Sequence, residues 1–475
     1  MGSLDMHMKR AALTLIACLA LSGCGRKAVV VRPPAISVDD LYRRGLEAFA
    51  QATPEGYLRA SNALRQAWLL APGRCELPLN LAQSLLFLAE EQLLNREEYE
   101  PAHREAVEVV EKVRTPCAMS EAFLLRLDSL ILGRSTATAE MMKRATEFEP
   151  ADPMNWHVYS KVEIVGRAEM IARAAELGRD SALHLFTSAA WQANRGARNQ
   201  ATRDLLRRVI ELSPRHFRAH LELAYALSGD DAVDEVEQVE PLFRKVTEIA
   251  PRFLEGRLAM GSYFAGIDEI DAAAAEYYAA IAANPRYDVA YFSIGLLMLQ
   301  AERSKEAEEA FLRVLELNAT QGEAFYYLGI LALNRDDIDT AKNRFQQALN
   351  IRTSYAPAEY GLGRVLQRQN DVDGALSRFD RAIRFAPNFA DPYLSRAAIR
   401  AERRQTSEAV SDLDRSIQLF DQQIAVADSA IEYAKSHPQS RAAQATARRS
   451  ERDKQRTQNA RQSASTFKAD LERAR

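Results

Sequence analysis

The sequence predicts an all-α solenoid built from a repeated helical hairpin. Three observations carry this prediction: a composition dominated by helix-forming residues, few strand-forming residues, and a period of 34 residues over much of the chain. Of the 475 residues, 47% are hydrophobic and 27% are charged, which is typical of a folded chain rather than a disordered one. The net charge of -3 gives no general reason to expect nucleic acid as a partner.

Small and large residues recur at fixed phases in the second half of the chain. One phase holds small residues and another holds large ones, and within each series neighbours stand 34 positions apart. The series are Gly261, Gly295, Gly329, Gly363 and Ala397, and Tyr277, Phe311, Phe345, Phe379 and Leu413. The small residues let the two helices of a hairpin approach closely, and the large residue fills the space between hairpins. Because no single hairpin buries its apolar face, neighbouring hairpins must stack.

This pattern resembles the tetratricopeptide repeat. The resemblance implies a right-handed α-solenoid of about eleven hairpins, with divergent units over 38–182 and a regular array over 183–423. Arg257, Glu359 and Arg396 stand where the family has apolar or aromatic residues, so the packing at these three positions departs from the pattern.

The chain beyond the last repeat changes character. Apolar residues predict one more amphipathic helix over 424–436, which would cap the solenoid. Residues 437–475 carry ten Lys or Arg and four Asp or Glu, with few apolar side chains other than Ala. Without an apolar stripe to dock it, we expect this segment to be a mobile, basic tail. It can touch anionic lipid, cell wall or an acidic protein, or simply be solvated.

The first 23 residues are typical of a secretory signal peptide. An apolar run over 11–21 follows Lys9 and Arg10. As a helix it would span about 16 Å, too short for the roughly 30 Å of bilayer hydrocarbon. Met8 is an alternative start of translation.

The run ends in Leu-Ser-Gly-Cys, which resembles the lipobox of bacterial lipoproteins. The resemblance implies cleavage of 1–23 and attachment of acyl chains, such as palmitate, to Cys24. Residues 24–37 would then form an extended tether, and Gly25 indicates the outer membrane, with the body facing the periplasm.

Cys75 and Cys117 are candidates for a disulfide, because an envelope location is oxidising. The bond would close a loop of about 43 residues and stabilise the fold by about 4 kcal/mol. Two free, buried thiols are an equally good interpretation.

The usual catalytic and cofactor motifs are missing from the sequence. His216 and His220 have the spacing of a metal pair without a third ligand, so a structural role is preferred. Asn370–Gly374 is better explained as a turn than as a calcium loop. We therefore expect no enzyme activity, no metal and no cofactor.

A concave groove lined by the first helix of each hairpin is the remaining candidate site. The resemblance assigns apolar residues to its wall and arginines to its far end. The candidate residues are Leu258, Phe292, Leu296, Tyr326, Ile330, Tyr360, Arg364, Arg368 and Arg400. This gradient predicts a protein or peptide partner with an apolar segment followed by acidic groups.

The preferred interpretation is an outer-membrane-anchored periplasmic scaffold that assembles or positions an envelope complex. A secretin or pilus, polysaccharide export and cell-wall enzyme assembly are the options, and oligomeric state stays open. The alternatives are a cell-wall or polysaccharide enzyme with an unfamiliar site, and a cytosolic adaptor if the lipobox is spurious.

Overall fold

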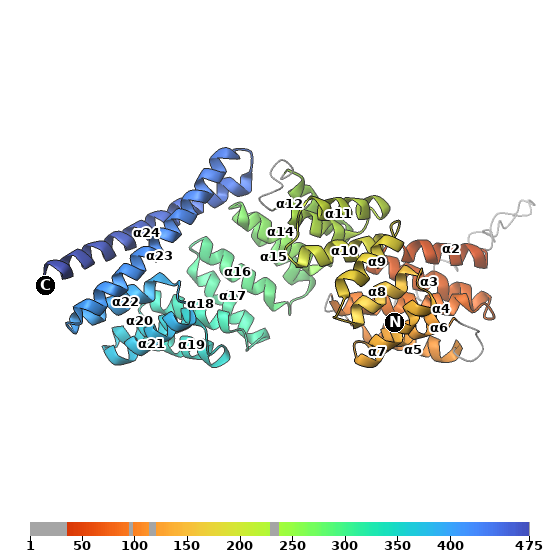
Figure 1. The fold of residues 1–475 in the computed structure, drawn as a ribbon, viewed down its shortest axis with the longest axis horizontal. Coiled ribbons are helices and arrows are strands. Elements are labelled where there is room, and N and C mark those ends of the chain that lie inside the picture. The colour runs from red at the N-terminus through yellow and green to blue at the C-terminus, as the bar shows by residue number, and fades with distance from the viewer. Residues whose placement is uncertain (1–35, 95–97, 114–119, 229–236, 475) are drawn as a thin grey trace, which may run out of the picture.

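The chain folds as an elongated stack of helical hairpins (Figure 1). The computed structural model describes residues 36–94, 98–113, 120–228 and 237–474. In these ranges there are 23 α-helices and no strand, and successive helices pack antiparallel. The predicted α-solenoid is confirmed.

Eleven hairpins account for all but the last helix of the described chain. The first six are α2 (Val38–Phe49) with α3 (Pro54–Leu70), α4 (Glu76–Leu94) with α5 (Glu100–Val113), α6 (Glu121–Leu132) with α7 (Thr136–Phe148), α8 (Pro153–Val162) with α9 (Arg167–Leu177), α10 (Ala182–Asn194) with α11 (Gln200–Leu212), and α12 (Phe217–Leu227) with α13 (Val239–Ile249). The others are α14 (Leu254–Gly266) with α15 (Ile270–Ala283), α16 (Asp288–Gln300) with α17 (Ser304–Leu317), α18 (Gly322–Asn334) with α19 (Ile338–Ile351), α20 (Ala356–Arg368) with α21 (Val372–Phe385), and α22 (Ala390–Glu402) with α23 (Thr406–Ser436). The last helix is α24 (Arg441–Arg473).

The 34-residue period is visible in the backbone itself. The turn inside each of the last five hairpins holds one non-glycine residue in the left-handed region, with φ between 59° and 62°. These residues are Asp268, Glu302, Asp336, Asn370 and Arg404. In each turn the following amide donates to the carbonyl five residues earlier, as Asp337 N does to Ala332 O at 3.0 Å. This bond closes the first helix of the hairpin.

A glycine of the first helix contacts the large residue of the second helix. A Cβ on Gly329 would lie 2.7 Å from a ring carbon of Phe345, and a Cβ on Gly363 would lie 2.5 Å from a ring carbon of Phe379. Both rings are fully buried. The predicted pairing of small and large phases is therefore the packing that holds each hairpin together.

Ion pairs replace apolar packing at the three departures from the repeat pattern. Arg257 pairs with Glu276 at 3.0 Å, and the fully buried Glu359 pairs with Arg378 at 3.0 Å. Arg396 contacts Asp412 at 2.5 Å. Each charge at these positions thus meets an opposite charge on the second helix of its own hairpin.

The first six hairpins curve so strongly that the fifth and sixth contact the first two. The Ser213 hydroxyl, in the α11–α12 turn, donates to the carbonyl of Gln51 in the α2–α3 turn at 2.9 Å. Nearby, Arg218 of α12 pairs with Glu91 of α4 at 3.0 Å. This seam joins the first two hairpins to the fifth and sixth.

The end of the chain differs from the prediction. Residues 424–436 are not a separate capping helix, because α23 runs without a break from Thr406 to Ser436. Residues 441–473 form α24, which lies along α23. The premise that this segment has no face to dock is wrong. One side of α24 packs against the protein through alanines, and Ala445 and Ala464 are fully buried.

Several predictions fall outside the described residues. These are the signal peptide over 1–23, Cys24, most of the tether over 24–37, and Cys117. Cys75 is disulfide-bonded, but its pairing with Cys117 stays a prediction.

Candidate protein-binding surface

Four predicted groove residues form a ladder of equivalent positions on the first helices of consecutive hairpins: Leu258, Phe292, Tyr326 and Tyr360. Each aromatic member contacts the large residue of the second helix in its own hairpin. The ring centroids are 5.6 Å apart for Phe292 and Phe311, 6.0 Å for Tyr326 and Phe345, and 5.8 Å for Tyr360 and Phe379. The structure therefore brings these ladder residues into equivalent environments.

The two ladder tyrosines also contact the hairpin that follows. The ring of Tyr326 lies 5.4 Å from that of Tyr355, and the ring of Tyr360 lies 5.1 Å from that of Phe389. Burial raises the pKa of Tyr326 to about 12. These rings, like that of Phe292, are half-buried wedges between helices, so only part of each faces the groove. Leu258 has the same character beside the buried Tyr287.

The two other apolar groove candidates, Leu296 and Ile330, differ in exposure. Leu296 of α16 has an exposed fraction of 37%, whereas Ile330 of α18 is half-buried against the core. The guanidinium of Arg364 lies 6.0 Å from the ring centre of Tyr360. Leu296 is thus the apolar groove residue that offers most surface to a partner.

The basic end of the groove is largely neutralised by the protein itself. Arg368 forms an ion pair with Asp336, and Arg400 forms one with Asp412 at 2.8 Å. Arg364 makes no ion pair within the described part of the chain. The expected acidic end of a partner therefore rests on Arg364 alone among the three predicted arginines.

The inner side of the first hairpins is filled by the protein's own rings. Phe49 contacts Tyr57 at 5.2 Å, Tyr57 contacts Phe87 at 5.5 Å, and Phe87 stacks on His157 at 5.9 Å. His184 continues the column at 5.6 Å from His157. This column fills the space between α4, α8 and α10, and a separate opening of about 440 Å³ lies between α4, α5, α6 and α8.

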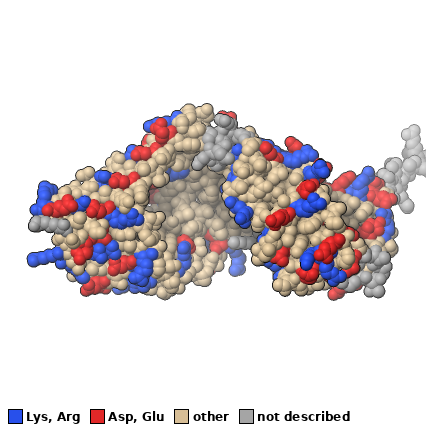
Figure 2. Space-filling view, in the orientation of Figure 1, with Lys and Arg blue, Asp and Glu red and all other residues tan. Residues whose placement is uncertain are grey.

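The second half of the solenoid has a hollow. Figure 2 shows the molecule hollowed in the region of α14 to α17, beneath the raised end of the α23–α24 hairpin, with mostly uncharged atoms on the floor. The hollow of the second half is thus a candidate site for a partner.

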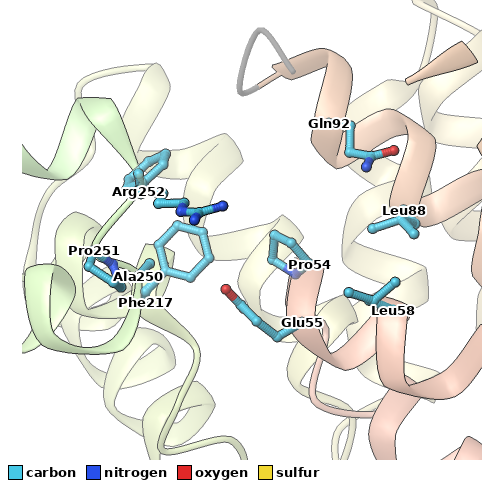
Figure 3. A pocket seen from close by; sticks show the side chains of 10 residues that line it. Pro54, Glu55, Leu58, Leu88, Gln92, Phe217, Ala250, Pro251 and Arg252 are labelled. Carbon is cyan, nitrogen blue, oxygen red and sulfur yellow. The ribbon is translucent and has the colours of Figure 1, made fainter. Parts of the chain in front are cut away.

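A separate cavity of about 340 Å³ lies in the seam of the first half. Figure 3 shows residues of α3 and α4 on one wall and residues of α12 and the α13–α14 turn on the other. Glu55 and Arg252 flank this cavity, and Leu58, Leu88 and Phe217 give it apolar walls. It is a gap in the contact of the first two hairpins with the sixth hairpin and the turn that follows it.

The paired histidines have structural partners. The backbone amide of Ala219 donates to Nδ1 of His216 at 3.2 Å, which caps α12, and Nε2 of His220 lies 3.0 Å from the carbonyl oxygen of Pro214. Within the described ranges no group of three or more His, Cys, Asp or Glu residues could hold a metal ion. In the same ranges, none of the helices combines the length and the apolar character that crossing a bilayer requires.

The described helices define an α-solenoid with a hollow in its second half. Residues 332–399, from the end of α18 through most of α22, match a family model described as tetratricopeptide repeat. The regular part of the array is therefore similar to the tetratricopeptide repeat over these residues. No match to this chain is found among curated proteins.

Three solved structures illustrate the similarity. YrrB, described as a TPR protein with an unusual peptide-binding site, is 23% identical over 37% of this chain and 91% of its own, with a TM-score of 0.32. The Cut9–Hcn1 heterotetramer of the APC/C is 15% identical over 93% and 98%, with a TM-score of 0.41. Pseudomonas aeruginosa pilF is 18% identical over 48% and 95%, with a TM-score of 0.38.

Proposed function

We propose that this protein is a scaffold that binds a protein partner in the hollow of its second half. In this proposal Cys24 carries acyl chains, including palmitate, and holds the protein on the periplasmic face of the outer membrane. There it would assemble or position an envelope complex. The groove would take an apolar segment of the partner, and Arg364 would meet an acidic group beside it.

One observation carries the proposal: the second half is hollowed beneath the raised end of the α23–α24 hairpin, and the floor of this hollow is mostly uncharged. Leu296 is 37% exposed, and the resemblance assigns it to the concave wall. An apolar side chain in that place can gain stability by burial against a partner. Scattered exposed apolar residues are common on any protein, so the concave position is what distinguishes Leu296.

A photoreactive residue at Leu296 tests the binding surface. We expect it to form a defined protein adduct in intact cells. The matched control is Leu312 on α17, which is 39% exposed and lies on the second helix of the same hairpin. Equal adducts from both positions, or none from Leu296, would reject the groove.

The substitution Leu296→Asp separates binding from folding. We expect it to abolish the adduct formed by a photoreactive residue at Ile330, while Leu312→Asp leaves that adduct intact. Serine in place of Phe292 or Tyr326 is a poorer test, because both rings pack against neighbouring helices. Such variants would change the stability of the fold as well as the groove.

The anchor has its own test. Cells grown with radioactive palmitate should label the protein, and Cys24→Ser should abolish the label and release the protein from the membrane fraction. Labelling that survives this substitution would remove the lipoprotein part of the proposal. An unlabelled protein found in the cytosol would favour a cytosolic adaptor instead.

A further inference from the structure

The last hairpin of the solenoid, α22–α23, has a much longer second helix than the hairpins before it. The second helix of each of the four preceding hairpins has 14 residues, whereas α23 has 31. The 17 extra residues extend α23 by about 25 Å beyond the end of the repeat. α24 then returns along α23, and Figure 1 shows the pair rising from the C-terminal end of the stack toward α14.

The antiparallel pair of α23 and α24 is held together by opposite charges. α23 carries six acidic and two basic residues, whereas α24 carries four acidic and nine basic ones. Its lower end is anchored in the core of the last repeat, where Ala464 packs with Ala397 and Leu413. The pair of α23 and α24 is therefore a packed arm that projects from the last repeat, α22–α23.

The tip of this arm contacts the hairpins that lie four and five units earlier in the stack. Arg441 pairs with Glu269 at 2.6 Å and with Glu240 at 3.4 Å. Arg448 and Arg449 both pair with Asp268, at 3.3 Å and 3.2 Å. These carboxylates lie on α13 and in the α14–α15 turn.

Two further contacts fix the position of the tip. The guanidinium of Arg449 donates to the carbonyls of Ala265, at 3.2 Å, and Gly266, at 2.9 Å. Both carbonyls are at the C-terminal end of α14, where the helix dipole favours a cation. Between the arginines, Ala445 is fully buried in the core that α14 belongs to.

These contacts close the second half of the solenoid into a ring. Hairpins α14–α15 to α22–α23 form the arc, and the arm joins the two ends of the arc across the hollow seen in Figure 2. We call the contacts of Arg441, Arg448 and Arg449 the latch. It is made mostly of exposed ion pairs, because the side chains of Arg441 and Arg448 are 55% and 54% exposed. Exposed pairs are weak and are screened by salt.

We propose that the α23–α24 arm is a clasp that fixes the width of the hollow, and that its three-arginine latch can open while the arm stays folded. Closed, the ring admits only a segment that fits or threads through the hollow. Open, the arc of hairpins can widen for a bulkier partner. The link to partner access rests on the function proposed above, whereas the clasp itself does not.

Hydrogen exchange and small-angle scattering on the full chain test the clasp without a partner. We expect backbone amides in 441–449 and 265–269 to exchange about 10-fold faster in the triple variant Arg441→Gln, Arg448→Gln, Arg449→Gln. The largest dimension of the particle should increase in the same variant. Exchange in 455–470 should stay as in the wild type.

Salt provides the same test without mutation. Between about 0.1 M and about 1 M salt the Debye length falls from about 10 Å to about 3 Å. The wild type should then approach the behaviour of the triple variant. The variant Arg461→Gln is the matched control, since Arg461 pairs with Asp421 inside the arm and not with α14.

A charge exchange keeps the proposal falsifiable if the triple variant misfolds. Arg441→Glu should open the latch, and adding Glu269→Arg should close it again. Wild-type exchange rates in the triple variant, no rescue by the charge exchange, or a dimer that makes the latch between two copies would each overturn the clasp.

The adduct at Leu296 distinguishes the clasp from the proposed function. A changed adduct yield in the triple variant supports control of access, and an unchanged yield rejects that control. If even the wild type forms no adduct, the function fails while the exchange and scattering results still decide the clasp.

Discussion

Asp414 and Lys468 form a 2.6 Å ion pair that belongs to a regular series. One heptad further along α23, Asp421 pairs with Arg461, and one heptad beyond that Asp428 pairs with Lys454 at 2.5 Å. The acids step forward by seven residues while the bases step backward by seven. This is the register of an antiparallel coiled coil, in which one face of each helix returns to the partner every seven residues.

The charge series predicts that the register of α23 on α24 depends on these pairs. Asp421→Lys should place like charges opposite each other and speed amide exchange over 455–465. Arg461→Asp added to it should restore protection, because the pair is then only reversed. Failure of the double variant to recover would mean that the packing of alanines alone sets the register.

The contact between Gly329 and Phe345 predicts a coupled effect of substitution. Gly329→Ala overpacks a site where the new Cβ would lie 2.7 Å from the ring. Overpacking costs about 1–3 kcal/mol, against a gain of about 1 kcal/mol in helix propensity. We expect a net loss of about 1 kcal/mol in the opening free energy of α18 and α19, measured by native-state hydrogen exchange.

A smaller partner should relieve that cost. In the last hairpin Ala397 already stands opposite Leu413, so Gly329→Ala should cost less in a Phe345→Leu background. Gly266→Ala is the control, because a Cβ there meets nothing within 4 Å. It should stabilise α14 by up to about 1 kcal/mol. A loss at Gly266 as large as that at Gly329 would contradict the packing argument.

The fully buried Glu359 predicts opposite results for two substitutions. Glu359→Ala leaves Arg378 and Arg381 without their shared carboxylate. Removing one partner of a buried pair costs about 3–5 kcal/mol. We expect about 1–3 kcal/mol, because the two arginines are 26% and 40% exposed and can be solvated. Thermal unfolding followed by circular dichroism measures the difference.

Glu359→Phe should be much better tolerated than Glu359→Ala. The equivalent position of the preceding hairpin is Phe325, whose ring lies 5.9 Å from the guanidinium carbon of Arg344. Arg344 and Arg378 are equivalent positions, 34 residues apart. A ring at position 359 can therefore contact the guanidinium of Arg378. A phenylalanine variant as unstable as the alanine variant would show that the ion pair itself is required.

The sequence predicted the repeats well because their signal is local and repeated. Gly329 and Phe345 take the same roles as their counterparts in neighbouring hairpins, so each unit confirms the next. The α23–α24 arm was missed because its packing depends on alanine and on charges spaced by seven, such as Asp414 and Asp421, and no apolar stripe marks it. The i, i+7 spacing of acids before the turn and bases after it was the signal that could have found the arm.

The groove was predicted only in part, for a related reason. Periodicity places Phe292 and Leu296 on the same helix face, but it does not say which one a neighbouring ring covers. Ion pairs between hairpins were also invisible, because Arg368 and its partner Asp336 belong to different repeats and nothing in the spacing of either repeat joins them. The filled column of the first half depends on the curvature of the whole array.

The buried histidines predict that the first half of the protein is sensitive to acid. Burial lowers the pKa of His184 to about 4 and that of His216 to about 3, against an ordinary value of 6.5. As the pH falls below about 6.5, these histidines bind protons in the unfolded chain but not yet in the folded chain. Stability is fully present above that pH and falls by about 1.4 kcal/mol per pH unit for each histidine until its folded pKa is reached.

This acid sensitivity should be confined to the first half, because no histidine lies between residues 221 and 436. All three tryptophans, Trp68, Trp156 and Trp191, also lie in the first half. Their fluorescence should therefore change at a higher pH than the circular dichroism signal, which reports both halves. His184→Leu should shift the fluorescence midpoint to lower pH, because the leucine does not titrate and the ring of His184 has no hydrogen-bond partner among the described residues. Coincident transitions, or a midpoint that this substitution leaves in place, would mean that groups other than the buried histidines govern acid unfolding.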